Sequence, residues 1–487
     1  MIKVESIAEY LNPNHKLGIG FSTLAAHGMI TLDGIVPVVA LNYVNSDPRL
    51  PLNTPQGDFY LTQTSIPALR PGEVALTNPV IDGLLGYYKR LGLLQDVNDV
   101  IQVEPKIGRF ENSVHGHPFT NVVANLDGQV RPIAERGLPI LISTFSDQYQ
   151  REYARSLGLQ TIGEHSSVEA NSKSRLREYQ KKYNYQMLPG AVIDNTSDLS
   201  RIVDEFKQFE SGVFLKFPTG SGGDLGIHLE IRSLKDLEEG IRKIRDRINQ
   251  ALNNGKFGIG IDDFWPPDMP CPPGLPLVIE AHYRNVGELI MNGSTQFITR
   301  SDGTWESYGI FKQYTNDKGE YLGNEPIVQA DLDTAQKGLI EAEVEKVARY
   351  NIDENRYFGL QGVDWFLIKR QDGTIACYIV ELNARPTANT PPLIIAQKLG
   401  ATFWLNINCF PANRDFPIHT IDDYIHIVGK DLADGENGQL VIPQAFRTFR
   451  TTDRLIPSPD FKAMIIGRDR QDIAQIVLEL HRRGIKV

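Results

Sequence analysis

The segment that most restricts how this chain folds is VDWFLIKRQDGTIACYIVELN, residues 363–383. Two runs rich in β-branched and aromatic residues flank Asp372-Gly373, a dipeptide typical of two-residue turns between antiparallel strands. We therefore predict a β-hairpin with this dipeptide at its tip. In the register that such a turn imposes, Asp364 lies directly opposite Glu381, and Asn383 follows two residues later on the same face.

This predicted pairing brings two carboxylates face to face, which is destabilising unless a cation lies between them. Carboxylate and amide oxygens are the ligands that Mg²⁺ prefers. Neighbouring strand residues such as Phe366, Ile379 and Leu382 are apolar. We therefore do not expect the two acids to be ordinary solvent-exposed charges. The hairpin indicates a divalent-metal site; an edge hairpin with solvated acids is the alternative.

A second motif is the glycine-rich segment GVFLKFPTGSGGDLGIHLEI, in which Lys216 precedes the loop Thr219–Gly226. Glycine lets backbone N–H groups approach a phosphate closely, and a nearby lysine adds positive charge. The loop joins two predicted strands and lacks GxxxxGK[ST], so it is not a Walker loop. The segment is compatible with phosphate binding, and a glycine-rich hairpin that binds nothing is the alternative.

Arg385 follows the hairpin in ELNARPTANTP. Its guanidinium is suited to stabilise charge that develops on a transferred phosphoryl group; a structural salt bridge is the alternative.

Other motifs do not support a different chemistry. LGIGFST lacks the third glycine of a dinucleotide-binding fingerprint, His115 and His117 have no matching ligand set, and no GxSxG sequence is present.

The composition favours a globular protein that acts on small molecules. Of 487 residues, 41% are hydrophobic and 23% charged, and the net charge is −10. An acidic chain lacks the long-range attraction to phosphate backbones that nucleic-acid binders use. The three cysteines form no CxxC pair, the first residues do not resemble a signal peptide, and no apolar run is long enough to span a bilayer. We expect a cytoplasmic protein with neither nucleic acid nor a membrane as partner.

Short apolar strands alternate with amphipathic helices, which predicts an α/β (α+β) architecture. The polar joint EHSSVEANSKSR indicates a domain boundary near residue 170. We predict domains over residues 1–170, 171–410 and 411–487, with a lid at about 190–278 and a metal-site half at about 279–410. Predicted elements include a strand at KLGIGFST and helices over the following ranges: Asp147–Leu157, 195–209, Leu234–Leu252, Asp331–Tyr350 and Arg470–Arg483.

Taken together, residues 160–410 resemble the ATP-grasp superfamily. SKSRLREYQKKY looks like that family's first nucleotide-contacting segment and GVFLKFPTGSGG like its second, which points to Lys173 and Lys216. LVIEAHY resembles the hinge that grips adenine and ribose, with Glu280 as the matching acid. Tyr283 stands where many relatives have a second acid, so Glu288 is an alternative ribose contact.

The resemblance implies the remaining site residues. The metal ligands are Asp364, Glu381 and Asn383, with magnesium as the ion and manganese as a substitute, and Arg385 is the adjacent catalytic arginine. Lys216 is both catalytic and ATP-binding. The other ATP-binding residues implied by the glycine loop are Gly220, Ser221, Gly222 and Gly223.

The implied fold is an ATP-grasp domain with an N-terminal pre-ATP-grasp α/β domain and a small C-terminal α/β piece. The implied reaction is ATP-dependent joining of a carboxylate to an amine through an acyl phosphate, with release of ADP and phosphate. The outer regions resemble the peptide-ligase branch typified by the pheganomycin-type ligase, which suggests an amino acid or peptide as the carboxylate. A small-molecule kinase and a silent nucleotide-binding regulatory protein are the alternatives, and a homodimer is left open.

Overall fold

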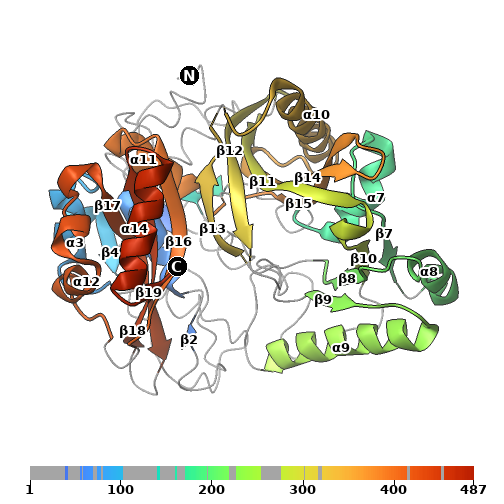
Figure 1. Cartoon of the computed structure of the whole chain (residues 1–487), viewed down its shortest axis with the longest axis horizontal. Coiled ribbons are helices and arrows are strands. Elements are labelled where there is room, and N and C mark those ends of the chain that lie inside the picture. Colours follow the sequence, from blue (N-terminus) through green and yellow to red (C-terminus); the bar gives the residue numbers. More distant parts are fainter. Residues whose placement is uncertain are drawn as a thin grey trace. The chain divides into compact units, whose positions relative to one another are not determined.

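The computed structural model describes most of the second half of the chain and shorter stretches of the first half (Figure 1). The described residues are 39–41, 55–56, 59–69, 74–77, 80–102, 140–142, 160–161, 170–194, 196–218, 226–253, 276–300, 302–315, 321–328, 330–385, 387–413, 417–450 and 455–487. The chain divides into two compact units. One comprises residues 165–321 and 327–385, and the other comprises residues 1–164, 322–326 and 386–487.

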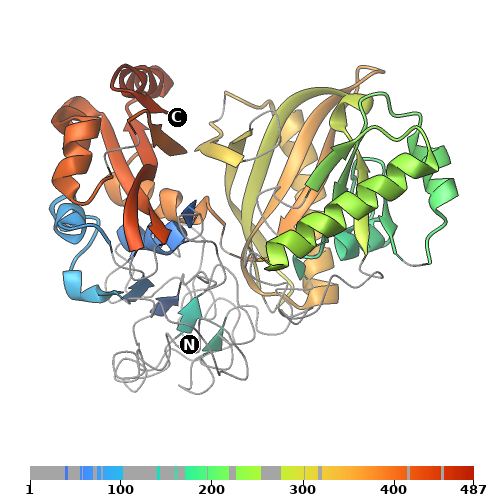
Figure 2. The same ribbon diagram turned by 90° about the horizontal axis from the view of Figure 1, so that it is seen from below.

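The first of these units, residues 165–321 with 327–385, begins with a four-stranded antiparallel sheet in the order β7-β10-β8-β9. Its strands are β7 (Gly190–Ile193), β8 (Val213–Lys216), β9 (Gly226–Leu229) and β10 (Leu277–Ala281). Helices α8 (Leu199–Phe206) and α9 (Leu234–Asn253) cover one face, and Figure 2 shows α9 running across it. Val213, Leu215 and Ile279 alternate along the strands and are fully buried against these helices. The opposite face therefore carries the polar residues of β8 and β10.

The second sheet of this unit contains the predicted hairpin. Its antiparallel strands are β11 (Gly287–Thr299), β12 (Trp305–Thr315), β14 (Gly359–Arg370) and β15 (Ile375–Asn383), in the order β15-β14-β11-β12. Helices α7 (Lys173–Tyr183) and α10 (Thr334–Tyr350) supply the remainder of its core. Trp365 is fully buried in that core, and its indole N–H donates to Thr295 Oγ1 at 2.9 Å.

The hairpin tip differs from the prediction. Arg370 N donates to Thr374 O at 2.7 Å, which encloses the three-residue loop Gln371–Gly373. Gly373 has a φ of +85°, which is the left-handed residue that a three-residue hairpin loop requires. The predicted two-residue turn at Asp372-Gly373 is therefore wrong, and the strand pairs next to the loop are one residue out of the predicted register, with Phe366 opposite Tyr378.

A β-bulge restores the predicted pairing at the far end of the hairpin. The register shifts between Asp364 and Trp365: Trp365 pairs with Ile379, whereas Asp364 pairs with Glu381, so Val380 is the extra residue. A bulge re-aims the side chains that follow it. Asp364 consequently faces Glu381 as predicted, although the loop length alone would have turned Glu381 away.

The other unit contains a parallel sheet and an antiparallel sheet. The parallel sheet has the order β4-β3-β1-β5-β6. Its strands are β1 (Val39–Leu41), β3 (Val74–Thr77), β4 (Val100–Gln102), β5 (Ile140–Ile142) and β6 (Gln160–Thr161). In the antiparallel sheet, β16 pairs with β13 and β18, and β18 pairs with β17. These strands are β13 (Tyr321–Pro326), β16 (Phe403–Pro411), β17 (Leu440–Arg450) and β18 (Leu455–Gly467).

Helices and short elements complete this unit. Its helices are α3 (Leu84–Arg90), α11 (Thr390–Leu399), α12 (Ile421–Val428), α13 (Lys430–Ala433) and α14 (Arg470–Arg482), and the short strands are β2 (Pro55–Gln56) and β19 (Ile485–Lys486). The short 3-10 and π turns of the chain are η1 (Phe59–Ala68), η2 (Val97–Asp99), η3 (Tyr283–Asn285), η4 (Asn351–Asn355) and η5 (Glu436–Gly438).

The helices predicted over Leu234–Leu252, Asp331–Tyr350 and Arg470–Arg483 are confirmed as α9, α10 and α14. Helix α10 begins later than predicted because Asp333 caps it, with its carboxylate accepting from Gln336 N at 2.8 Å. The helix predicted over 195–209 is shorter, as α8. The strand predicted at KLGIGFST, the helix over Asp147–Leu157 and the proline-rich stretch before β10 lie outside the described residues. No helix in the described part of the chain is long and apolar enough to cross a membrane.

Gly293 is required for the packing of Trp365. A Cβ at Gly293 would lie 2.3 Å from the ring of Trp365. Because that ring is fully buried and cannot swing away, Gly293→Ala should destabilise the protein by about 1–3 kcal/mol. Gly338→Ala is the matched control: it lies in α10 with open space around it and should stabilise by up to about 1 kcal/mol. Urea unfolding of both variants tests this, and equal stability of the two would contradict it.

Candidate functional site

The N-terminus of α7 lies where three segments meet. Ser172 caps the helix, with its hydroxyl accepting from Arg175 N at 3.3 Å. Lys173 N donates to Pro218 O at 2.7 Å, at the end of β8 and directly before the glycine-rich segment. Asn171 Oδ1 accepts from Ala384 N at 2.9 Å, at the end of β15. The first turn of α7 thus anchors both segments in which the sequence placed phosphate and metal chemistry.

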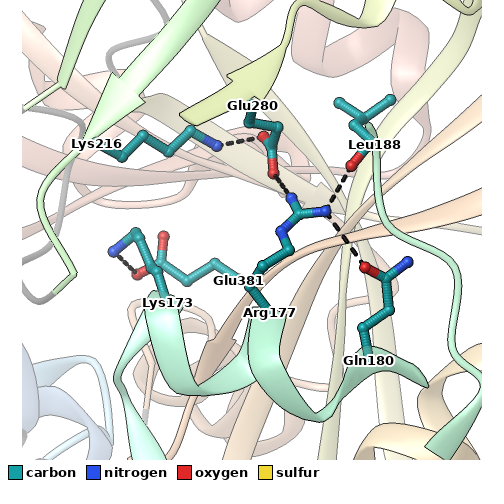
Figure 3. A network of polar contacts seen from close by, with 7 residues as sticks. All are labelled: Lys173, Arg177, Gln180, Leu188, Lys216, Glu280 and Glu381. Carbon is teal, nitrogen blue, oxygen red and sulfur yellow. Dashed lines mark hydrogen bonds and ion pairs between the residues drawn. The ribbon is translucent and has the colours of Figure 1, made fainter. Parts of the chain in front are cut away.

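Two basic side chains, one helical turn apart on α7, reach carboxylates on two different sheets (Figure 3). Lys173 Nζ lies 2.8 Å from Glu381 Oε1 on β15. Arg177 Nη2 lies 2.6 Å from Glu280 Oε2 on β10. Positions four residues apart share one face of a helix, so a single helix face serves both acids.

Glu280 is held by two cations. Its second oxygen, Oε1, lies 2.5 Å from Lys216 Nζ. Glu280 and Arg177 are only 3% and 7% exposed, and Arg177 Nη1 also donates to Leu188 O at 2.6 Å. Gly190 permits this arrangement, because a Cβ there would lie 2.8 Å from the Arg177 guanidinium. Sequence reasoning singled out Glu280 and Lys216 but missed Arg177, whose charge alone did not distinguish it from the other basic residues of α7.

Asp364 and Glu381 form the face-to-face pair at the bulge. Burial and the neighbouring Glu381 raise the pKa of Asp364 from 3.8 to about 6. Asp364 Oδ1 accepts from Gln313 Nε2 at 2.9 Å, and its Oδ2 accepts from Asn383 Nδ2 at 3.1 Å. The three predicted metal ligands are therefore brought together, and Gln313 on β12 is a neighbour that the sequence did not reveal.

Arg385 is the partly buried cation beside this pair. Burial lowers the pKa of its guanidinium, whereas Glu381 and Asp364 act to raise it. Arg385 Nη1 donates to Asn171 Oδ1 at 2.8 Å, so one asparagine side chain fixes both the guanidinium and the backbone of Ala384. Asn171 is a positioning residue that no motif indicated.

This donor set fits a magnesium ion. Two opposed carboxylates and one amide are present, and a half-turn of the Asn383 amide would direct its oxygen toward the same point. Among the described residues no group of three or more His, Cys, Asp or Glu side chains could form a metal site by itself. A partial oxygen set suits Mg²⁺, which keeps water molecules and binds phosphate oxygens in addition to one or two carboxylates.

An aromatic group lies on the same face of the β8–β10 sheet as Lys216 and Glu280. Phe214 pairs with Glu280 in register, and its ring stacks on His282 at 5.4 Å between centroids. Burial, His228 and Arg284 lower the pKa of His282 to about 4, so this ring is neutral at physiological pH. Tyr283 follows, 4.4 Å from His282 between centroids. These flat, uncharged rings provide an apolar surface beside the buried acid.

Glu288 and the glycine-loop residues are the remaining predicted positions. Glu288 is exposed at the start of β11, where it pairs with Lys369. The loop glycines and serine lie outside the described residues: Gly220, Ser221, Gly222 and Gly223.

Comparisons with known proteins identify the fold. No protein-family model and no curated protein matches the sequence. Among solved structures, biotin carboxylase from Campylobacter jejuni matches with a TM-score of 0.52 and 13% identity, over 85% of this chain and 87% of that chain. The mixed α/β architecture is that of the ATP-grasp fold, as predicted.

Two N5-carboxyaminoimidazole ribonucleotide synthetases also match. The one from Aspergillus clavatus, solved with ADP and 5-aminoimidazole ribonucleotide, has a TM-score of 0.49, 12% identity, and coverage of 92% of this chain and 98% of that chain. The one from Thermus thermophilus has a TM-score of 0.48, 11% identity and the same coverage, 92% and 98%.

Replacement of Arg177 tests the Glu280 network. Arg177→Leu leaves a buried carboxylate with Lys216 as its remaining charged partner, and breaking a buried pair in this way should cost about 3 kcal/mol of stability. Arg242→Leu on α9 is the matched control, because both members of its pair with Asp246 are more than half exposed. Its midpoint of unfolding should stay close to that of the wild type. Equal effects of the two substitutions would contradict a structural role for the buried network.

The raised pKa of Asp364 predicts a pH-dependent gain in stability on removal of its charge. The unfolded chain loses this proton near 3.8 and the folded protein near 6, so ionisation opposes folding increasingly as the pH rises through that window. In chelator, Asp364→Asn should be more stable than the wild type above pH 6, and the difference should vanish near pH 4. Thermal unfolding across this range measures it. A variant that is no more stable than the wild type at pH 8 would contradict the expectation.

Proposed function

We propose that the protein is an ATP-dependent ligase that joins a carboxylate to an amine through an acyl phosphate, releasing ADP and phosphate. The observation that carries this proposal is the grouping of Lys173 and Arg385 around the opposed pair Asp364 and Glu381. Lys216 adds a further cation at Glu280, which Arg177 joins to the same helix as Lys173. Cations beside a magnesium-type acid pair are the components that phosphoryl transfer from a nucleotide requires. The ATP-grasp fold, shared with a biotin carboxylase solved as a complex with β-γ-ATP, supports the same conclusion.

The proposed residue roles follow from position and charge. Lys173 and Lys216 exchange their carboxylate partners for phosphate oxygens when the nucleotide enters, together with the loop that contains Gly220, Ser221, Gly222 and Gly223. Glu280, fixed by Arg177, accepts hydrogen bonds from the nucleoside, with Glu288 as a second candidate. Asp364, Glu381 and Asn383 would hold magnesium, which neutralises phosphate charge when bound.

In the first step a substrate carboxylate oxygen attacks the γ-phosphorus, the bond to the β-phosphate oxygen breaks, and ADP leaves. Arg385 stabilises negative charge on the transferred group. In the second step an amine nitrogen attacks the acyl carbon, loses a proton and displaces phosphate, which leaves an amide. Water must be kept from the acyl phosphate, a role we assign to the lid at about residues 190–278.

The finer assignments remain proposals. We propose an amino acid or peptide as the carboxylate, a small-molecule amine as its partner, and action in the cytoplasm, with the pheganomycin-type peptide ligases as the nearest functional analogue. The division into domains over 1–170, 171–410 and 411–487 is likewise proposed.

The decisive experiment measures ADP release from magnesium-ATP with pools of amino acids and small carboxylates, with and without amines, followed by mass spectrometry. Amine-dependent ADP release, with a product lighter by one water than its two reactants, supports the ligase. A phosphorylated product without amine dependence would instead establish a kinase. ATP binding without any turnover across the pools would favour a silent nucleotide-binding protein.

Two substitutions test the residue roles. Glu381→Gln should abolish turnover and leave the fold intact, because it removes a proposed metal ligand and the partner of Lys173 while its strand pairing persists. Lys216→Ala should weaken ATP binding at least about tenfold, since it removes a charge-assisted phosphate contact. Lys207→Ala is the matched control, because this lysine is half-exposed after α8 and pairs only with the exposed Asp204. Full activity of Glu381→Gln would refute the metal assignment.

A further inference from the structure

A row of polar side chains crosses the antiparallel sheet of the unit that contains residues 386–487. Asn324 on β13 pairs with Asn406 on β16, and Asn408, two residues further along β16, pairs with Lys462 on β18. Directly paired residues and residues two apart point to the same face of a sheet, so these side chains share one face. Figure 1 shows the central strands β16, β17 and β18 of this sheet.

A bulge in β17 adds a glutamine to the row. The register between β17 and β18 shifts after Pro443, so Gln444 is the extra residue and Ala445 pairs with Lys462. Gln444 therefore lies in the bulge between Pro443, which pairs with Ala463, and Ala445, which pairs with Lys462. Bulges recur where a strand must re-aim a functional side chain.

These polar groups are buried without partners among the described residues. Asn324, Asn406 and Gln444 are each 0% exposed. Both amide atoms of Asn324 and of Gln444 and the Oδ1 atom of Asn406 lack a hydrogen-bond partner. An unsatisfied buried polar group lowers the free energy of unfolding by about 1–3 kcal/mol. Three buried amides without hydrogen-bond partners therefore destabilise the fold substantially. Such groups are retained in proteins where water or a ligand satisfies them.

Lys462 adds a charge to the row. It is 4% exposed, and burial lowers the pKa of its amine to about 8. Asp460 lies two residues away on the same strand and is also buried. No ion pair joins Lys462 to any carboxylate in the part of the chain that the structure describes. A buried ammonium of this kind is stabilised when an anion is brought to it.

A hydrogen bond joins the row to the segment that follows Arg385 in the chain. Asn406 Nδ2 donates to Ala388 O at 3.5 Å. Ala388 comes three residues after Arg385 in the chain. Ala388 and Asn406 both belong to the unit that contains residues 386–487, so this contact lies within that unit.

We propose that Asn324, Asn406, Gln444 and Lys462 form a substrate-binding site, in which the lysine binds an oxyanion and the amides hydrogen-bond its polar neighbours. Because it deepens the ligase assignment, this inference rests on the proposed function. The occupant is a substrate that carries an oxyanion, either a carboxylate or a phosphate, next to peptide-like donors and acceptors. The oxyanion bound here serves recognition and is not the carboxylate that becomes phosphorylated.

The test measures binding without nucleotide, so it does not depend on turnover. The full chain is titrated calorimetrically with glycylglycine and, separately, with inorganic phosphate, which distinguishes a carboxylate site from a phosphate site. One of the two should bind to the wild type. Lys462→Met should weaken that binding at least about tenfold, while magnesium-ATP binding is unchanged. Met464→Leu is the matched control, since Met464 pairs with Asn406 on the same face and carries no polar group.

A second measurement separates a binding site from a structural network. If the polar groups are kept for binding, Gln444→Leu and Lys462→Met should leave the midpoint of thermal unfolding unchanged or raise it. Lower midpoints in both variants would overturn the proposal. So would the absence of binding by either probe, or phosphate binding that Lys216→Ala removes and Lys462→Met does not. Failure of ADP release alone would count against the ligase and leave this result standing.

Discussion

Helix α7 is the element on which the site depends. Lys173 and Arg177 stand one turn apart on it and neutralise Glu381 and Glu280, which belong to two different sheets. Without these contacts each sheet would carry a poorly solvated carboxylate with one cation fewer, and an unpaired buried charge is strongly destabilising. The helix therefore links the sheet that carries Lys216 to the hairpin that carries the acid pair, and the charges that a nucleotide would meet are in place beforehand. Such preorganisation is how a protein lowers the cost of stabilising developing charge.

The charged groups of the site lower the stability of the nucleotide-free protein. The raised pKa of Asp364 means that the folded chain resists ionisation of this carboxyl. Lys173, Lys216, Arg177 and Arg385 outnumber the three carboxylates Glu280, Asp364 and Glu381, so the described part of the site retains an excess of positive charge. A magnesium nucleotide, whose phosphates are anionic and whose ion prefers oxygen ligands, would relieve both imbalances at once.

Residues that belong to a local sequence motif could be predicted as part of the site, whereas residues whose partners are distant in sequence could not. The opposition of Asp364 and Glu381 was predicted correctly from a turn that is wrong, because a three-residue loop and the bulge at Val380 shift the register in opposite senses. A bulge has no local sequence signature, so register arguments hold only to within one residue. Arg177 and Asn171 were missed for a related reason: their partners are distant in sequence, and nothing in α7 distinguishes a buried arginine from its exposed neighbours.

The polar row also shows that a local sequence pattern does not determine which residues pack against it. In β16 and β18, polar residues alternate with apolar ones at Asn406, Asn408 and Lys462, a pattern that normally predicts a strand with one face in water. The structure buries Asn406 and Lys462 instead. Alternation specifies which side chains share a face, but it cannot say whether that face is solvated, because burial is decided by what packs against the sheet. When alternation predicts exposure and the fold imposes burial without partners, the mismatch marks residues whose polar groups await water or a ligand. That reasoning, which no motif supplies, leads from the sheet to the proposed recognition site within the unit that contains residues 386–487.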